Sequence, residues 1–193
     1  MKSQVWTAPN QLTLLRLIFV PFAIINVLDA HYGWALGIFV AAGLSDALDG
    51  LLARWLKQKT TLGEYLDPIA DKLLLSSMFL VLSITHQIPW RYTVMVFSRD
   101  VSILAVAALL YATTSLRDFR PSVYGKINTF SQIAVVFFVL LANVHPANWL
   151  AGARTIFLYA TFAFTVISGV HYVFVTGYRL HKGQNRLTTS PDS

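Results

Sequence analysis

Four aspartates with helical spacing are the residues best suited to chemistry: Asp46, Asp49, Asp67 and Asp71. The first two are three residues apart and the last two are four apart, so each pair shares one face of its own helix. Carboxylates beside a bilayer are costly unless they pair or bind cations, and neighbouring carboxylates repel unless they are neutralised. Mg²⁺ binds oxygen ligands and often shares them with substrate phosphates. The pattern therefore predicts a site for one or two divalent cations that performs phosphoryl transfer.

Small and basic residues between the two aspartate pairs fit this prediction. Gly50 and Ala53 follow the first pair on nearly the same helical face, which leaves space for a bulky ligand. Gly63 lets the chain backbone approach a ligand closely. Arg54 supplies a planar guanidinium that suits phosphate.

Other interpretations of these residues remain open. Asp67 precedes Pro68 and could be a helix cap, and Arg54 could be one of the positive charges that set membrane topology. Asp46 and Asp49 could belong to an ion or proton relay in a small transporter. A transporter predicts polar residues through several spans, whereas several of the apolar runs here are almost unbroken, which favours an enzyme.

The composition is that of a membrane protein. The chain has 193 residues, of which 55% are hydrophobic and 12% charged, with a mean hydropathy of +0.57. A soluble domain carries about 25% charged residues. The net charge of +6 comes from basic residues scattered between apolar runs, so anionic lipid or phosphate is favoured over nucleic acid as a partner. The sequence has no cysteine, which excludes disulfides and thiolate metal sites.

Six apolar runs suit a hydrocarbon core about 30 Å thick. They cover approximately residues 12–28, 34–55, 67–85, 90–114, 127–143 and 149–178. We therefore expect an all-α fold with six transmembrane helices in one domain, residues 1–180, followed by a polar, disordered tail, 181–193. Most basic residues fall on the side of the membrane where the N-terminus lies, which predicts that both termini are cytoplasmic. No transit extension precedes Pro9, so we expect a bacterial plasma membrane.

The motif Asp46-x-x-Asp49-Gly50-x-x-Ala53-Arg54-x8-Gly63-x-x-x-Asp67-x-x-x-Asp71 resembles the complete signature of the CDP-alcohol phosphatidyltransferases. The resemblance implies an integral-membrane homodimer that uses CDP-diacylglycerol. In such enzymes an acceptor hydroxyl attacks the phosphorus attached to diacylglycerol, and CMP leaves.

The resemblance also implies roles for individual residues. The four aspartates would hold Mg²⁺ or Mn²⁺, and Asp71 would also be the general base that takes the acceptor proton. The residues implied in CDP-diacylglycerol binding lie in the first apolar run and in the motif: Asn10, Thr13, Arg16, Gly50, Ala53, Arg54 and Gly63.

The flanking sequence narrows the acceptor. Pro9-Asn10-x-Leu12-Thr13-x-x-Arg16 resembles members that act on glycerol-type acceptors. Ser98-Arg99-Asp100 and Lys126-Ile127-Asn128-Thr129-x-x-Gln132 resemble cardiolipin synthases, which use phosphatidylglycerol. The alternative acceptor is glycerol 3-phosphate, as in phosphatidylglycerophosphate synthases. In either case we expect four basic residues to bind the acceptor phosphate: Arg99, Arg117, Arg120 and Lys126.

Arg99 has a second interpretation, because it lies inside an apolar run. A lone arginine at the centre of a span costs about 2.5–3.5 kcal/mol on insertion scales. A structural pair with Asp100, or with another helix, would remove this cost.

Overall fold

The structure is a computed structural model that describes residues 8–55, 61–113 and 123–188. Within these ranges the chain forms six α-helices and no β-strand, which confirms the expected all-α class. The helices are α1 (Ala8–Leu28), α2 (Tyr32–Trp55), α3 (Thr61–Ile84), α4 (Trp90–Thr113), α5 (Val123–Val144) and α6 (Asn148–Thr188).

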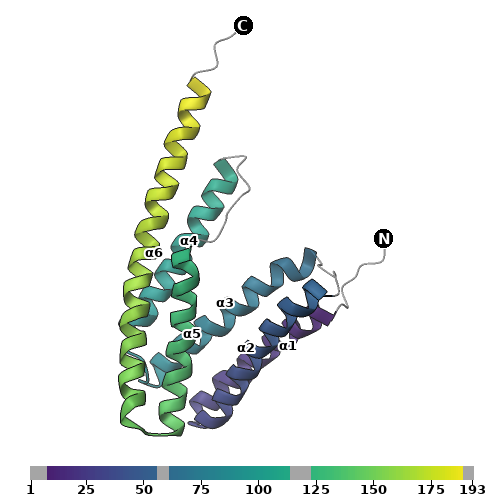
Figure 1. Ribbon diagram of the computed structural model, residues 1–193, viewed down its shortest axis with the longest axis vertical. Coiled ribbons are helices and arrows are strands. Elements are labelled where there is room, and N and C mark those ends of the chain that lie inside the picture. The colour runs from purple at the N-terminus through teal and green to yellow at the C-terminus, as the bar shows by residue number, and fades with distance from the viewer. Residues whose placement is uncertain (1–7, 56–60, 114–122, 189–193) are drawn as a thin grey trace.

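The six helices run alternately up and down and form two arms (Figure 1). One arm contains α1, α2 and α3, and the other contains α4, α5 and α6. α1 packs on α2 and α3, α6 packs on α4 and α5, and α5 also contacts α2. The arms meet at the end formed by the turns 29–31, 85–89 and 145–147, which we call the closed end. They diverge at the open end, where α1 begins and α6 terminates.

Two turns at the closed end stop their helices in the same way. Ala30 and His86 both have a φ of 58°, the left-handed conformation common just after a helix. The amide of His31 donates to the carbonyl of Asn26 at 2.8 Å, and the amide of Gln87 donates to that of Leu82 at 2.7 Å. Each turn thereby satisfies carbonyls that a helix end leaves open, and the chain reverses at once.

One contiguous apolar cluster holds the two arms together near the closed end. It draws fully buried residues from α1, α3 and α5, among them Ala23, Val27, Met78, Phe79, Leu82, Val135, Val139 and Leu140. Most of the cluster lies in the half of the bundle next to the closed end. The apolar core therefore does not hold the arms together at the open end.

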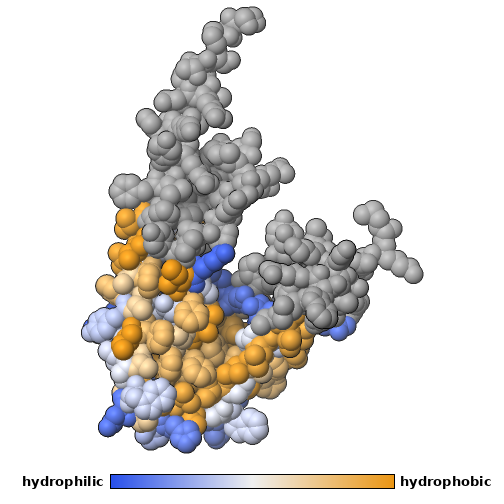
Figure 2. Space-filling view, in the orientation of Figure 1, coloured by the Kyte–Doolittle hydropathy of each residue, from blue (hydrophilic) through white to orange (hydrophobic). Residues whose placement is uncertain are grey.

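The outer surface of the bundle is strongly apolar (Figure 2). Exposed large hydrophobic residues follow α1 and α6, including Ile18, Phe22, Ile25, Ile156, Phe162, Val166 and Val170. Such an extensive apolar surface marks contact with lipid rather than water. Among the described residues, three segments are long and apolar enough to cross a membrane by length and composition: Gln11–Leu28, Gly125–Val144 and Asn148–Val170.

Two helix boundaries differ from the sequence expectation. α3 begins at Thr61, so Asp67 lies in the second turn of the helix and not at a capping position. α6 continues to Thr188, so residues 181–188 are helical where a disordered tail was expected. At the end of α6 the residues that extend the helix beyond its apolar run are mostly polar.

The buried position of Phe79 gives a test of the packing between the arms. Its side chain is fully buried, whereas the neighbouring Leu80 is 41% exposed. We expect Phe79→Ala to lower the free energy of unfolding by about 3–5 kcal/mol, because it leaves a cavity. Thermal unfolding in detergent measures this, with Leu80→Ala as the matched control. Equal losses in the two variants would contradict the core described here.

Candidate active site

A buried arginine joins the first three helices. Arg16 of α1 is fully buried, and its Nη2 lies 3.0 Å from Oδ1 of Asp46 on α2. Its Nη1 donates to Oδ1 of Asp71 on α3 at 2.6 Å. One guanidinium therefore binds a carboxylate from each aspartate pair, which brings Asp46 and Asp71 together.

The arginine of this cluster is buried, whereas its two carboxylate partners are about half exposed. The side chain of Arg16 is 1% exposed, whereas those of Asp46 and Asp71 are 48% and 44% exposed. Thr13, one turn earlier on α1, is also fully buried. The cation thus forms the floor of the site, while both carboxylates keep surface that a ligand can reach.

These carboxylates fit a divalent cation in their donor chemistry. They are hard oxygen ligands from two helices, and they already share one positive charge. Asp49 lies one turn after Asp46 on α2, and Asp67 lies one turn before Asp71 on α3. Their side chains fall outside the described residues, as do those of Asn10, Gly50, Ala53, Arg54 and Gly63. Among the described side chains, no three acidic or histidine groups gather as a metal site.

A second charged cluster lies on the neighbouring face of α3. Successive helix residues are rotated by about 100°, so Lys72 points to a different side than Asp71. Lys72 forms an ion pair with Oδ1 of Asp100 on α4. Nη1 of Arg99 binds the same oxygen at 2.8 Å, and Nη2 of Arg99 lies 3.2 Å from Oγ of Ser168 on α6. Two cations share one carboxylate, so this cluster has a net charge of +1.

Arg99 is therefore paired, both with Asp100 and with another helix. This is the structural pairing that the sequence left open, and it keeps Arg99 beside α3. Lys126 is exposed near the start of α5. Arg117 and Arg120, the other two expected acceptor residues, lie outside the described residues.

A buried polar seam between α5 and α6 extends this cluster. Oγ1 of Thr165 donates to Oδ1 of Asn128 at 3.0 Å, and both side chains are buried. The Nδ2 of Asn128 and the Nε2 of Gln132 are buried without a hydrogen-bond partner in the described part of the chain. Leaving such donors unpaired costs about 1–3 kcal/mol each, so they mark a place where a ligand oxygen would be favoured.

Sequence reasoning missed Lys72 and Ser168 as members of this cluster, whereas it offered Asp100 as a structural partner of Arg99. One signal was present: Thr161, Thr165 and Ser168 recur at helical spacing within an apolar run, and all three are buried. The shared role of Asp100 had no such signal, because it depends on how α3 packs beside α4. Figure 2 shows hydrophilic surface at the point where the two arms diverge.

Fold and site together define a helical membrane-type bundle with a carboxylate site at the open side of its first three helices. Residues 6–167 match the model of the CDP-alcohol phosphatidyltransferase family. The chain belongs to this family.

Several curated proteins are similar to the chain. The rat and human cardiolipin synthases (CMP-forming) are 33% and 34% identical over 89% and 84% of this chain. The chain spans 62% and 58% of the length of these two relatives. A Mycobacterium tuberculosis protein described as a "probable phosphatidylglycerophosphate synthase" is 36% identical over 89% of this chain and 82% of its own length.

The ion pairs of Arg16 give a test of the site as built. We expect Arg16→Gln to lower the free energy of unfolding by about 2 kcal/mol, less than for a fully buried pair because the carboxylates are half exposed. Thermal unfolding in detergent with chelator should show a midpoint about 4–8 °C lower.

Divalent cations should then raise the unfolding midpoint of Arg16→Gln more than that of the parent protein, since they replace the lost positive charge. Lys126→Gln, which removes an exposed cation, is the matched control. If Arg16→Gln lowers the unfolding midpoint no more than Lys126→Gln does, the result would contradict the role of Arg16 in joining the three helices.

Proposed function

We propose that the protein is an integral-membrane phosphatidyltransferase that moves the phosphatidyl group of CDP-diacylglycerol to a glycerol-type acceptor. The observation that carries this proposal is the convergence of Asp46 and Asp71 on one positive charge in a chain of this family. A cation bound by carboxylates from two helices suits a pyrophosphate substrate, whose negative charge needs the same neutralisation.

Asp46, Asp49, Asp67 and Asp71 are the residues that would hold one or two Mg²⁺ or Mn²⁺ ions. Such ions would supply charge neutralisation on the pyrophosphate and on the leaving phosphate oxygen. The two described carboxylates support this assignment, because their exposed surface lies opposite the buried guanidinium.

The chain's own residues would position and deprotonate the acceptor. Asp71 takes the proton of the acceptor hydroxyl, whose oxygen forms a new bond to the phosphorus that bears diacylglycerol. The bond from that phosphorus to the bridging oxygen breaks, and CMP leaves with the electron pair. The group proposed to bind CDP-diacylglycerol is Asn10, Thr13, Arg16, Gly50, Ala53, Arg54 and Gly63.

The acceptor is proposed to be phosphatidylglycerol, which would make the product cardiolipin. The described cluster of Lys72, Arg99 and Asp100 has a net charge of +1, which would attract the phosphodiester of this lipid. Arg117, Arg120 and Lys126 complete the proposed acceptor group. The similarity to cardiolipin synthases supports the same choice.

Glycerol 3-phosphate is the second candidate acceptor. It is favoured by the similarity to the mycobacterial protein, of which the chain covers 82%.

We also propose six membrane spans, with both termini and the carboxylate site on the cytoplasmic side of a bacterial plasma membrane, and a homodimer. The alternating helices and the location of the helix ends in Figure 1 support an even number of spans. On this arrangement CMP leaves into water, while lipid substrates approach from the bilayer.

Asp71 provides the sharpest test of the reaction. We expect Asp71→Asn to lower the transfer rate at least about 1000-fold, because it removes a metal ligand and the base together. CMP release from CDP-diacylglycerol in detergent micelles measures this rate. Asp29→Asn, at an exposed carboxylate in the α1–α2 turn, should keep the parent rate. Near-normal CMP release by Asp71→Asn would contradict the role assigned to Asp71. Full activity in excess chelator would contradict the metal-dependent reaction.

The acceptor is tested by supplying purified protein with CDP-diacylglycerol, Mg²⁺ or Mn²⁺, and each acceptor in turn. We expect a phosphatidyl product from phosphatidylglycerol. Product from glycerol 3-phosphate alone would reject the cardiolipin proposal and leave the family reaction intact.

Arg99→Gln serves as an arm of the same experiment. It should raise the KM for the acceptor about tenfold, through loss of a charged hydrogen bond, with little change in the KM for CDP-diacylglycerol. Ser102→Ala, at an exposed residue further along α4, is the control. Equal rises in both KM values would assign Arg99 to packing alone.

A further inference from the structure

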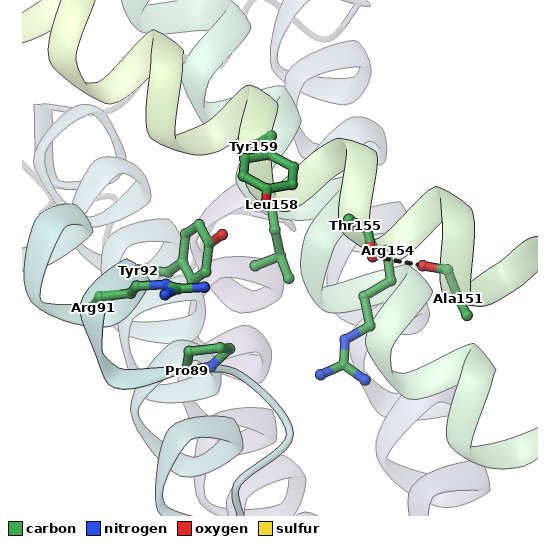
Figure 3. A pocket seen from close by; sticks show the side chains of 8 residues that line it. All are labelled: Pro89, Arg91, Tyr92, Ala151, Arg154, Thr155, Leu158 and Tyr159. Carbon is green, nitrogen blue, oxygen red and sulfur yellow. Dashed lines mark hydrogen bonds between the residues drawn. The ribbon is translucent and has the colours of Figure 1, made fainter.

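A cavity of about 260 Å³ lies at the closed end, between the start of α4 and the first turns of α6 (Figure 3). Its lining contains two arginines, two tyrosines and one threonine beside apolar residues: Pro89, Arg91, Tyr92, Ala151, Arg154, Thr155, Leu158 and Tyr159. None of these residues belongs to the carboxylate site, which lies towards the other end of the bundle. The cavity is therefore a separate feature.

The two arginines project from α4 and α6 toward the space between these helices (Figure 3). Arg154 is held in place by a hydrogen bond from its Nη2 to the carbonyl oxygen of Gln87 in the α3–α4 turn. The guanidinium carbon of Arg91 lies 5.2 Å from the centre of the Tyr92 ring. No carboxylate lines the cavity, and in the described part of the chain neither arginine has an ion-pair partner. The cavity thus carries two positive charges without an internal anion.

The cavity lies near the closed end of the bundle, where the apolar segment of α6 begins. The segment of α6 that could cross a membrane begins at Asn148, and the α6 residues of the lining follow within about 5–16 Å of it. Trp90 and Trp149 begin α4 and α6 and are 48% and 65% exposed. Exposed tryptophans at helix ends are typical of the membrane–water interface. The uncompensated charges are therefore close to lipid phosphates.

We propose that this cavity binds the phosphate group of an anionic phospholipid from the membrane leaflet at the closed end. Arg91 and Arg154 would hold the phosphate from two sides, since a guanidinium offers paired donors to phosphate oxygens. The anchored position of Arg154 prepares the cavity for its ligand, because that side chain needs no reordering on binding.

A lipid fits better than a free phosphate ion because of what surrounds the cavity. Leu158 forms an apolar wall, and Phe162, one turn later on the same helix, is exposed. Acyl chains can lie along these side chains while the phosphate stays between the arginines. A zwitterionic lipid brings its own cation and neutralises the two arginines less well, which favours an anionic headgroup.

This inference goes beyond the proposed transfer reaction and does not rest on it. The experiment uses the full-length protein in detergent with a chelator, which removes any divalent-dependent binding at the carboxylate site. The probe is a short-chain phosphatidate, and the readout is the rise in thermal unfolding midpoint with its concentration. Diacylglycerol with the same acyl chains and inorganic phosphate are titrated in parallel.

The variants are Arg91→Gln, Arg91→Gln combined with Arg154→Gln, and Lys182→Gln. Arg91 is exposed and makes no hydrogen bond to another helix that the structure describes, so its variant should fold even if the double variant does not. Lys182 lies 28 residues after Arg154 on α6, about 40 Å away along the helix, and its variant removes the same charge.

We expect phosphatidate to stabilise the parent protein and Lys182→Gln equally. Arg91→Gln should raise the half-saturating phosphatidate concentration about tenfold, and the double variant should lose the response. An unchanged response in Arg91→Gln would overturn the proposal. So would equal stabilisation by diacylglycerol, which lacks the phosphate, or equally tight binding of inorganic phosphate, which lacks the lipid.

Discussion

The ion pairs of the buried Arg16 constrain the whole first arm of the bundle. A buried guanidinium is strongly unfavourable without a carboxylate partner, so α2 and α3 must present Asp46 and Asp71 to α1. The two carboxylates would repel each other without that cation. The buried guanidinium and the carboxylate pair therefore stabilise each other. Both carboxylates stay partly exposed in this arrangement. The ion pairs that stabilise the fold therefore also form a candidate binding site.

α3 links this site to the rest of the molecule. Asp71 turns toward the first arm and Lys72, the next residue, turns toward the second, where Asp100 binds it. In the proposed reaction the donor phosphates and the acceptor phosphate would therefore lie on two sides of one helical turn. The described surface at the point where the arms diverge is hydrophilic (Figure 2).

Much of this arrangement could be predicted from the sequence. The apolar runs and the turn residues between them indicate the number and order of the helices, and the aspartate spacing predicts that two pairs face each other. Helix ends were harder, because Gly63 and Glu64 interrupt the apolar residues of 61–66, and residues 179–188 are mostly polar. The two partners of Arg16 were not predictable, since they lie 30 and 55 residues away along the chain and the pairing depends on how the helices pack. Asp100 as a shared anion had the same limitation.

The arginines of this chain differ in where their negative partner comes from, and burial decides the difference. Arg16 is fully buried, and two aspartates supply its anions. Arg99 is 10% exposed and shares one carboxylate with Lys72, which leaves this pair of cations with a net charge of +1 beside the proposed acceptor. Arg91 and Arg154 border a cavity that no carboxylate lines, and the phosphate of a lipid is the anion proposed for them. A positive charge that has no carboxylate partner in an apolar setting is thus a place where the phosphate of an external ligand would be favoured.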